Sequence, residues 1–244
     1  MTRNLLIRGM VAGILAAILA TLFARALAEP QVDLAIAYEA SHSAHEAHSM
    51  PGMPSAKEPE LVSRGTQKGL GLLTALTLYG AAVGGIFALV FAAIYGRIGS
   101  IGPRSLALLL ALAAFIAMAL VPALKYPPTP PAVGQHETVA FRTIAFFSMI
   151  ALSIVTMVVA VKVSRALRDR LGSFNATLAG GAAYIVLIAA VQFALPAINE
   201  VPTDFPAVVL WNFRVAAIAI QFLLWLAIGT IFGTLADRTL RQVR

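Results

Sequence analysis

Six long apolar runs most constrain what this chain can fold into. Each is near the ~20 residues that a helix needs to cross a bilayer, and each is apolar on every face instead of alternating as a barrel strand would. Because backbone groups in lipid must pair within their own segment, the runs predict an all-α polytopic membrane protein with about six transmembrane helices. The runs are Leu5–Ala28, Leu70–Tyr95, Ser105–Leu124, Thr143–Val161, Ala176–Ile198 and Val215–Leu235.

The composition agrees with a chain that faces lipid. Of the 244 residues, 59% are hydrophobic and only 12% are charged, whereas about a quarter of a soluble protein is charged. The chain has no cysteine, which excludes disulfides, iron–sulfur clusters, thiolate zinc sites and thiol nucleophiles. A metal ion must therefore bind through nitrogen, oxygen or thioether ligands.

The basic residues indicate the orientation of the spans. If the N-terminus is cytoplasmic, 11 of the 18 Lys and Arg residues fall on the inner side and nine of the 11 acidic residues fall outside. This is the bias of bacterial inner-membrane proteins. We therefore expect both termini in the cytoplasm, and we attribute the net charge of +7 to topology and not to nucleic-acid binding.

The first span allows two interpretations. Its basic start, its apolar run and the Ala26-Leu27-Ala28 sequence also fit a secretory signal with a cleavage site. Arg25 and the length of the run favour a retained helix, and cleavage would leave five spans. The expected organisation is a first helix or signal anchor over 1–28, an external loop rich in His and Met over 29–69, and a five-helix core over 70–244.

The external loop carries the clearest chemical signal. Three of the four histidines in the chain and two methionines lie within twelve residues; they are His42, His45, His48, Met50 and Met53. Imidazole binds cobalt, nickel, copper and zinc, and thioether adds a preference for softer ions such as Cu(I). Because His42 and His48 are six residues apart, a regular helix would not bring all three rings to one face. We expect a flexible loop that folds around an ion; the alternative is a disordered polar loop with incidental histidines.

Two proline-containing segments at the membrane edge supply the other candidates. One follows the third span and the other joins the fifth and sixth spans. The candidate transport-path residues in and beside them are Lys125, Tyr126, Asn199, Glu200, Trp211 and Arg214. An arginine inside lipid is costly, so we expect Arg214 to snorkel or to pair with Glu200 or Asp204. Among these candidates, Glu200 is the one that we most expect to touch a cation.

Three Gly-x-x-x-Gly spacings predict close helix packing. They are Gly9 with Gly13, Gly80 with Gly84, and Gly229 with Gly233. The same spacing is frequent in glycine-rich lipid helices.

The two edge segments, with the histidine loop, resemble the CbtA-type family of predicted cobalt transporter subunits. The matching stretches are Lys125-Tyr-Pro, Pro130-Pro-Ala-Val-Gly134, Glu137-Thr138, Arg142-Thr143, Asn199-Glu200-Val-Pro202, Phe205-Pro-Ala and Leu210-Trp211-Asn-Phe-Arg214, with Arg64 and Gln67 before the second span. The resemblance implies cobalt uptake linked to cobalamin synthesis. It also implies a small single-span partner of the CbtB type that carries its own histidines.

The remaining functional expectations follow from motifs that are absent. The sequence has no G-x-x-x-x-G-K-[ST] motif and hence no P-loop, and we expect neither an enzyme nor a permanently bound cofactor. A divalent transition metal, with cobalt preferred, is the expected substrate. Three alternatives stay open: a protein that handles copper or nickel, a metal-sensing accessory subunit without permease activity, and a membrane enzyme that uses Glu200 and Arg214 as an acid–base pair.

Overall fold

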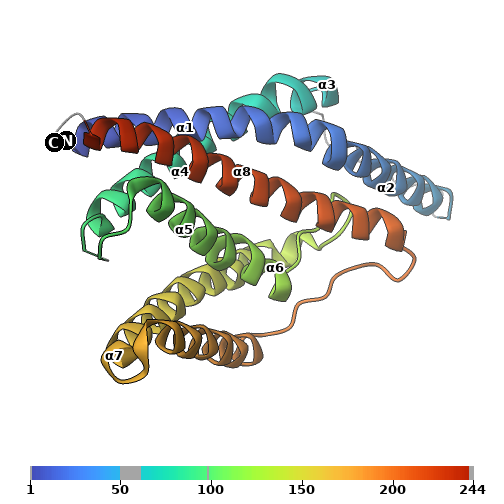
Figure 1. The fold of residues 1–244 in the computed structure, drawn as a ribbon. Helices are drawn as coiled ribbons and strands as arrows, with labels where there is room; N and C mark the ends of the chain where they lie inside the picture. The colour runs from blue at the N-terminus through green and yellow to red at the C-terminus, as the bar shows by residue number, and fades with distance from the viewer. Residues whose placement is uncertain (1, 50–61, 98, 242–244) are drawn as a thin grey trace. The chain divides into compact units, whose positions relative to one another are not determined.

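The computed structural model describes residues 2–49, 62–97 and 99–241, and every regular element in them is helical. The prediction of an all-α fold is confirmed. The elements, drawn in Figure 1, are α1 (Thr2–Phe23), η1 (Ala24–Ala28), α2 (Glu29–Ser49), α3 (Arg64–Thr66), η2 (Gln67–Gly71), α4 (Leu72–Ile94), α5 (Pro103–Phe115), η3 (Ile116–Leu120), α6 (Val121–Lys125), η4 (His136–Thr138), α7 (Val139–Ala194) and α8 (Ala207–Arg241).

Five continuous helical stretches in the described residues are long and apolar enough to cross a membrane. The stretch His136–Ala194 is two helices joined at Gly172, whose φ of 74° and ψ of 167° are not helical. Only glycine adopts such a φ without strain, so Gly172 reverses the chain where the sequence suggested a longer basic connection. With this turn, the described chain contains the six predicted apolar helices.

The segment predicted to be an external loop begins as a helix. The first span passes through the wide π-helical turn η1 and continues as α2 to Ser49. Pro30 would ordinarily break a helix, because its ring clashes with the carbonyl four residues earlier, and a π-turn directly before it makes room for the ring. The expectation of a flexible loop is therefore wrong for 29–49. The same device recurs at η3, which directly precedes Pro122.

The contacts divide the chain into two compact units, which we describe separately. Unit 1 comprises Met1–Leu112, Thr129–Ala132 and Thr203–Arg244, and unit 2 comprises Ala113–Pro128 and Val133–Pro202. In unit 1, α1 and α8 run side by side in opposite directions (Figure 1), and the Arg8 guanidinium donates a 2.6 Å hydrogen bond to the Leu235 carbonyl oxygen.

Glycines set the helix packing in unit 1. A Cβ atom added to Gly9 or Gly13 of α1 would overlap the carbonyl oxygen of Gly84 or Gly80 of α4. On α8, a Cβ at Gly229 would stand 2.7 Å from the Cβ of Ala111 on α5. All three predicted small-residue spacings are therefore confirmed as helix–helix contacts, which suits a bilayer, where close van der Waals packing is a main source of helix association.

A buried carboxylate holds one end of unit 1 together. The side chain of Asp237 is 8% exposed and accepts from Arg104 Nε at 3.0 Å and from Arg241 Nε at 3.1 Å. Arg104 lies in the first turn of α5 and Arg241 in the last turn of α8. The charges of this basic end are thus used to join two helices.

Unit 2 is built on the hairpin of α7. Its core is Val121, Met149, Ala160, Tyr184 and Ile188. The two arms of the hairpin are joined by a buried 3.0 Å hydrogen bond between the hydroxyls of Ser153 and Tyr184. Gly180 also allows close approach, because a Cβ there would stand 2.7 Å from that of Ser164.

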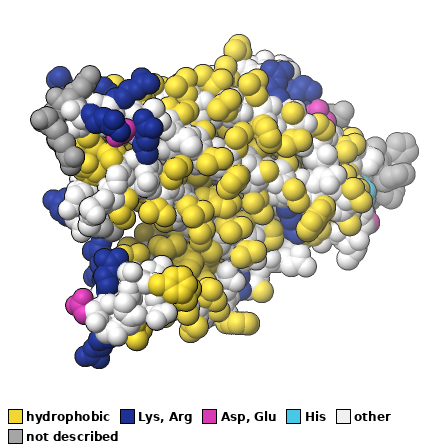
Figure 2. Space-filling view, viewed as in Figure 1, with side chains coloured by type: hydrophobic (Ala, Val, Ile, Leu, Met, Phe, Trp, Pro, Cys, Tyr) yellow, Lys and Arg dark blue, Asp and Glu magenta, His cyan; other side chains and the backbone are white. Residues whose placement is uncertain are grey.

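Large apolar side chains cover the outside of the helices. Hydrophobic side chains fill much of the visible face in Figure 2, and Lys and Arg gather in separate clusters. Phe193 is 91% exposed and Phe174 75%. Such exposure is unfavourable in water and is what a helix facing lipid requires.

Candidate functional site

The predicted histidine cluster lies at the end of α2. His42 is described with its side chain, and His45 and His48 belong to the same helix but their side chains lie outside the described part. Met50 and Met53 lie outside the described residues altogether. The structure thus carries geometry for one of the five predicted metal ligands.

His42 faces an acidic residue that is distant in sequence. Its Nε2 atom lies 2.5 Å from Oδ2 of Asp204, in the segment before α8. The Tyr38 ring stacks against the imidazole with 4.0 Å between centroids, and Phe205 packs edge-on against Tyr38 at 4.9 Å. This contact joins the end of α2 to the start of α8 within unit 1.

Asp204 is held in its ionised form by its neighbours. The Tyr38 hydroxyl is buried and makes no hydrogen bond of ordinary geometry, but it lies near Asp204. The pKa of Asp204 is lowered from 3.8, first by the Tyr38 hydroxyl and then by His42. A full negative charge therefore faces the imidazole at neutral pH.

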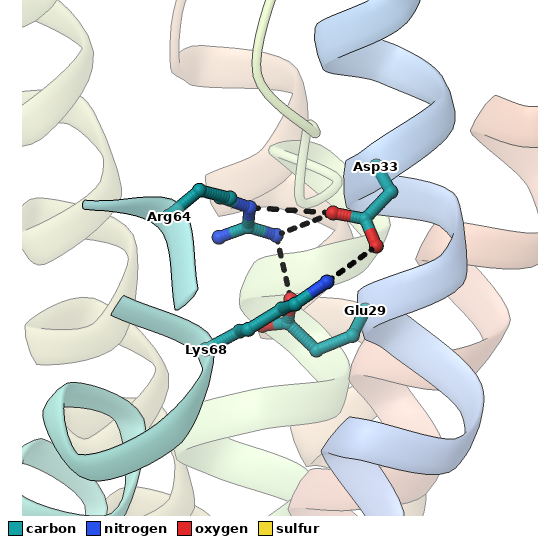
Figure 3. Close-up of polar contacts among 4 residues, drawn as sticks. All are labelled: Glu29, Asp33, Arg64 and Lys68. Carbon is teal, nitrogen blue, oxygen red and sulfur yellow. Dashed lines mark hydrogen bonds and ion pairs between the residues drawn. The ribbon is translucent and has the colours of Figure 1, made fainter. Parts of the chain in front are cut away.

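Two acidic and two basic side chains form an ion-pair cluster at the start of α2, which we call the Arg64 cluster (Figure 3). Arg64 Nη2 lies 2.5 Å from Glu29 Oε2 and 3.3 Å from Asp33 Oδ1, and Lys68 Nζ lies 3.3 Å from Asp33 Oδ2. Glu29 and Asp33 are four residues apart, as are Arg64 and Lys68, so each pair shares one face of its helical segment. The sequence analysis missed this cluster, although that matched spacing could have indicated it. It anchors both ends of the segment between α2 and α3.

The two proline-containing segments meet within unit 2. The Tyr126 hydroxyl donates a 2.9 Å hydrogen bond to the carbonyl oxygen of Pro196. Lys125, the last residue of α6, is partly buried. Asn199 is exposed, and its side-chain oxygen accepts from the amide of Val201 at 3.4 Å. The structure therefore brings Tyr126 to the segment that carries Asn199 and Glu200.

Glu200 pairs with Arg142. Its Oε2 atom accepts a 2.8 Å hydrogen bond from the amide of Gln135 and lies 3.4 Å from Arg142 Nε. The side chains of Glu200 and Arg142 are 14% and 28% exposed. Gly134, with a φ of 115°, leaves the space that the Arg142 guanidinium fills, because a Cβ there would overlap it. Glu200 is thus already neutralised by a cation.

The surroundings of Glu200 favour its charged form. The pKa of Glu200 is lowered from 4.5, chiefly by a hydrogen bond from the Thr138 side chain, then by the Gln135 amide, with the charge of Arg142 a further contribution. Partial burial opposes this shift. The carboxylate is therefore ionised and available to a cation at neutral pH.

Arg214 differs from its expected pairing. Of the two carboxylates proposed as its partners, Glu200 pairs with Arg142 and Asp204 with His42. Among the described residues, Arg214 Nε is buried without a hydrogen-bond partner. Trp211, three residues earlier on α8, is 68% exposed and suits contact with lipid or a partner. Sequence spacing suggested Asp204 for Arg214 because the two are close along the chain, but the long-range contact with α2 takes that carboxylate.

Comparison with protein families identifies the chain. The model of the family described as "Probable cobalt transporter subunit (CbtA)" matches residues 2–237. The chain belongs to this family. No curated protein and no solved structure matches it.

The family assignment fits the fold, since this CbtA-family chain has several helices that can cross a membrane. Cobalt is accordingly its substrate and not a resident cofactor. Within the described residues, no group of three or more His, Asp or Glu side chains is gathered as a metal site. In this CbtA-family chain, the described groups with metal-binding chemistry are the pair of His42 and Asp204 and the carboxylate of Glu200.

Proposed function

We propose that this chain is the membrane subunit of a cobalt uptake transporter in a bacterial inner membrane, with the His-containing end of α2 on the outer face. The observation that carries the proposal is the match to the CbtA family over residues 2–237. The coordinates add chemistry in support, because an imidazole and a carboxylate face each other at the end of α2. Both are common ligands of first-row divalent metals.

The two ends of unit 1 support this orientation. One end carries Arg8, Arg104 and Arg241 around the buried Asp237. The other carries His42 with Asp204, and the Arg64 cluster. Because basic residues favour the cytoplasmic side, the first end is assigned to the cytoplasm and the second to the outside, where a scarce cation would be captured.

The membrane potential supplies the driving force in this proposal. An inside-negative potential favours entry of one elementary charge by about 2.3 kcal/mol per 100 mV. A divalent ion gains about 4.6 kcal/mol, which corresponds to roughly a thousandfold accumulation. The chain has no P-loop of its own, so this energy source fits the sequence.

Glu200 is the proposed contact for the ion in unit 2. Arg142 neutralises the carboxylate in the empty protein, and an arriving dication would displace the guanidinium from it. This exchange avoids leaving a partly buried carboxylate without a counter-charge. The other proposed path residues, Lys125, Tyr126, Asn199, Trp211 and Arg214, lie on the same two chain segments or at the start of α8.

A small single-span subunit of the CbtB type is the proposed partner. Arg214 and the exposed Trp211 near the start of α8 offer a polar and an aromatic contact for a neighbouring helix. Trp is well suited to the edge of a bilayer.

Accumulation of radiolabelled cobalt tests the proposal. The chain is expressed with and without the small partner in a host that lacks cobalt uptake, beside a variant with His42, His45 and His48 changed to Ala and a matched Asp169→Asn control on exposed α7. We expect chain-dependent accumulation that weakens in the triple variant at low cobalt and recovers at high cobalt. No accumulation with either partner state would refute uptake.

The thioethers of Met50 and Met53 favour one second candidate, a copper- or nickel-handling protein or a metal-sensing accessory subunit. Copper or nickel accumulation in the same cells, without cobalt accumulation, would support metal handling of that kind. Cobalt transport by the partner alone, with this chain altering only its regulation, would support the accessory role.

A further inference from the structure

The pair of His42 and Asp204 is open to solvent and joins two distant segments. The side chains are 47% and 57% exposed, and 162 residues separate them along the chain. No sequence pattern indicated Asp204 as a neighbour of the histidine segment. A solvated pair of this kind contributes little to stability, so a structural role alone explains it poorly.

The hydrogen bonds of His42 fix which ring nitrogen can bind a metal. Nδ1 lies 3.0 Å from the Tyr38 carbonyl oxygen and 3.5 Å from the Ser41 hydroxyl, whose proton is donated to the same carbonyl. Nδ1 therefore faces two oxygen acceptors and carries the proton. A metal-binding histidine almost always donates its second ring N–H to such an oxygen, which orients the ring. This leaves Nε2 as the ligand atom, and Nε2 points at Asp204.

From this geometry we propose that His42 Nε2 and Asp204 Oδ2 together form a two-ligand capture site for a first-row divalent cation, with water completing the coordination. The proposal rests on the proposed function and adds to it a ligand that lies outside the histidine segment. The ion takes the place of the hydrogen between the two atoms.

Only a small movement is needed to admit an ion. Bonds from a first-row divalent ion to imidazole nitrogen and carboxylate oxygen are about 2.0–2.2 Å long, so the two ligand atoms must stand about 3 Å apart when they meet at about a right angle. They lie 2.5 Å apart without the ion. Rotation of two half-exposed side chains supplies this difference without moving a helix. Asp204 also brings a negative charge that offsets part of the charge of the ion.

Cobalt binding to the purified full-length chain in detergent tests the site. Equilibrium dialysis with radiolabelled cobalt compares the wild type with His42→Ala, Asp204→Ala, the double variant and the exposed control Asp169→Ala. We expect each single change to weaken binding about tenfold or more. The double variant should lose little beyond either single variant, because residues that act as a pair are not additive. Melting temperature and size-exclusion profile check that each variant is folded.

The outcomes separate this site from the proposed function. Binding by Asp204→Ala equal to that of the control overturns the site, as do losses in the two single variants that add in the double variant. Cobalt binding that needs both residues supports the site even if cells expressing the chain accumulate no cobalt, a result that would overturn the proposed function alone.

Discussion

Gly13 of α1 and Gly80 of α4 touch backbone to backbone, and a Cβ atom on Gly13 would overlap the carbonyl oxygen of Gly80. Backbone atoms in two packed helices cannot rotate away as a side chain can. The two helices therefore depend on both positions lacking a side chain.

Gly13→Ala should destabilise the protein by about 1–3 kcal/mol, the usual cost of overpacking. The matched control is Gly181→Ala in α7, where a Cβ meets nothing within 4 Å and alanine favours the helix. Thermal melting in detergent measures both. Equal melting temperatures for the two variants would show that α1 and α4 are not in this contact.

The first helix should remain in the mature protein. Cleavage after Ala28 would remove Gly9 and Gly13 from α4 and the Arg8 hydrogen bond from Leu235 of α8. Intact-mass spectrometry of the membrane-extracted protein with a C-terminal tag measures this. A mature N-terminus at Glu29 would contradict it and make the first span a signal peptide.

Asp237→Asn should lower stability by about 1–2 kcal/mol, because the carboxylate is buried and satisfies both Arg104 and Arg241. Asp169→Asn, at an exposed position of α7, is the control and should be neutral. Chemical unfolding in mixed detergent compares them. A neutral Asp237→Asn variant would mean that α5 and α8 do not meet at this carboxylate.

Glu200 should make stability depend on pH. Its pKa is lowered from 4.5 in the folded protein, so its ionised form stabilises the fold above that ordinary value, and the stabilisation disappears as pH falls through the lowered pKa. Between about pH 5 and pH 3 the melting temperature of the wild type should therefore fall more steeply than that of Glu200→Gln. Parallel curves for the two proteins would show that Glu200 lacks these partners.

The helices could be predicted from the sequence because lipid imposes a length and an apolar composition on each span. The boundaries could not. Helix α2 continues to Ser49 because the residues after Pro30 include no further proline or glycine, and the π-turn over Ala24–Ala28 that admits Pro30 has no sequence signature. Gly172 could have been recognised as the turn only by knowing that both flanking segments stay helical up to it.

The candidate site was predicted in residue type more than in pairing. Glu200 was selected correctly as a carboxylate at the membrane edge, but its partner Arg142 lies 58 positions away. Asp204 was assigned to nearby Arg214 and instead meets His42, 162 residues distant. Contacts of this kind follow from tertiary packing of helices, which one sequence does not reveal.

Cobalt influx into proteoliposomes tests the central claim most directly. The purified chain, with and without the small partner, is placed in vesicles in which a potassium gradient and an ionophore set an inside-negative potential. We predict accumulation of radiolabelled cobalt that disappears when the potential is abolished, and that needs more external cobalt when His42, His45 and His48 are alanine. Influx no faster than in protein-free vesicles, with the partner present and the potential applied, would contradict cobalt uptake by this chain.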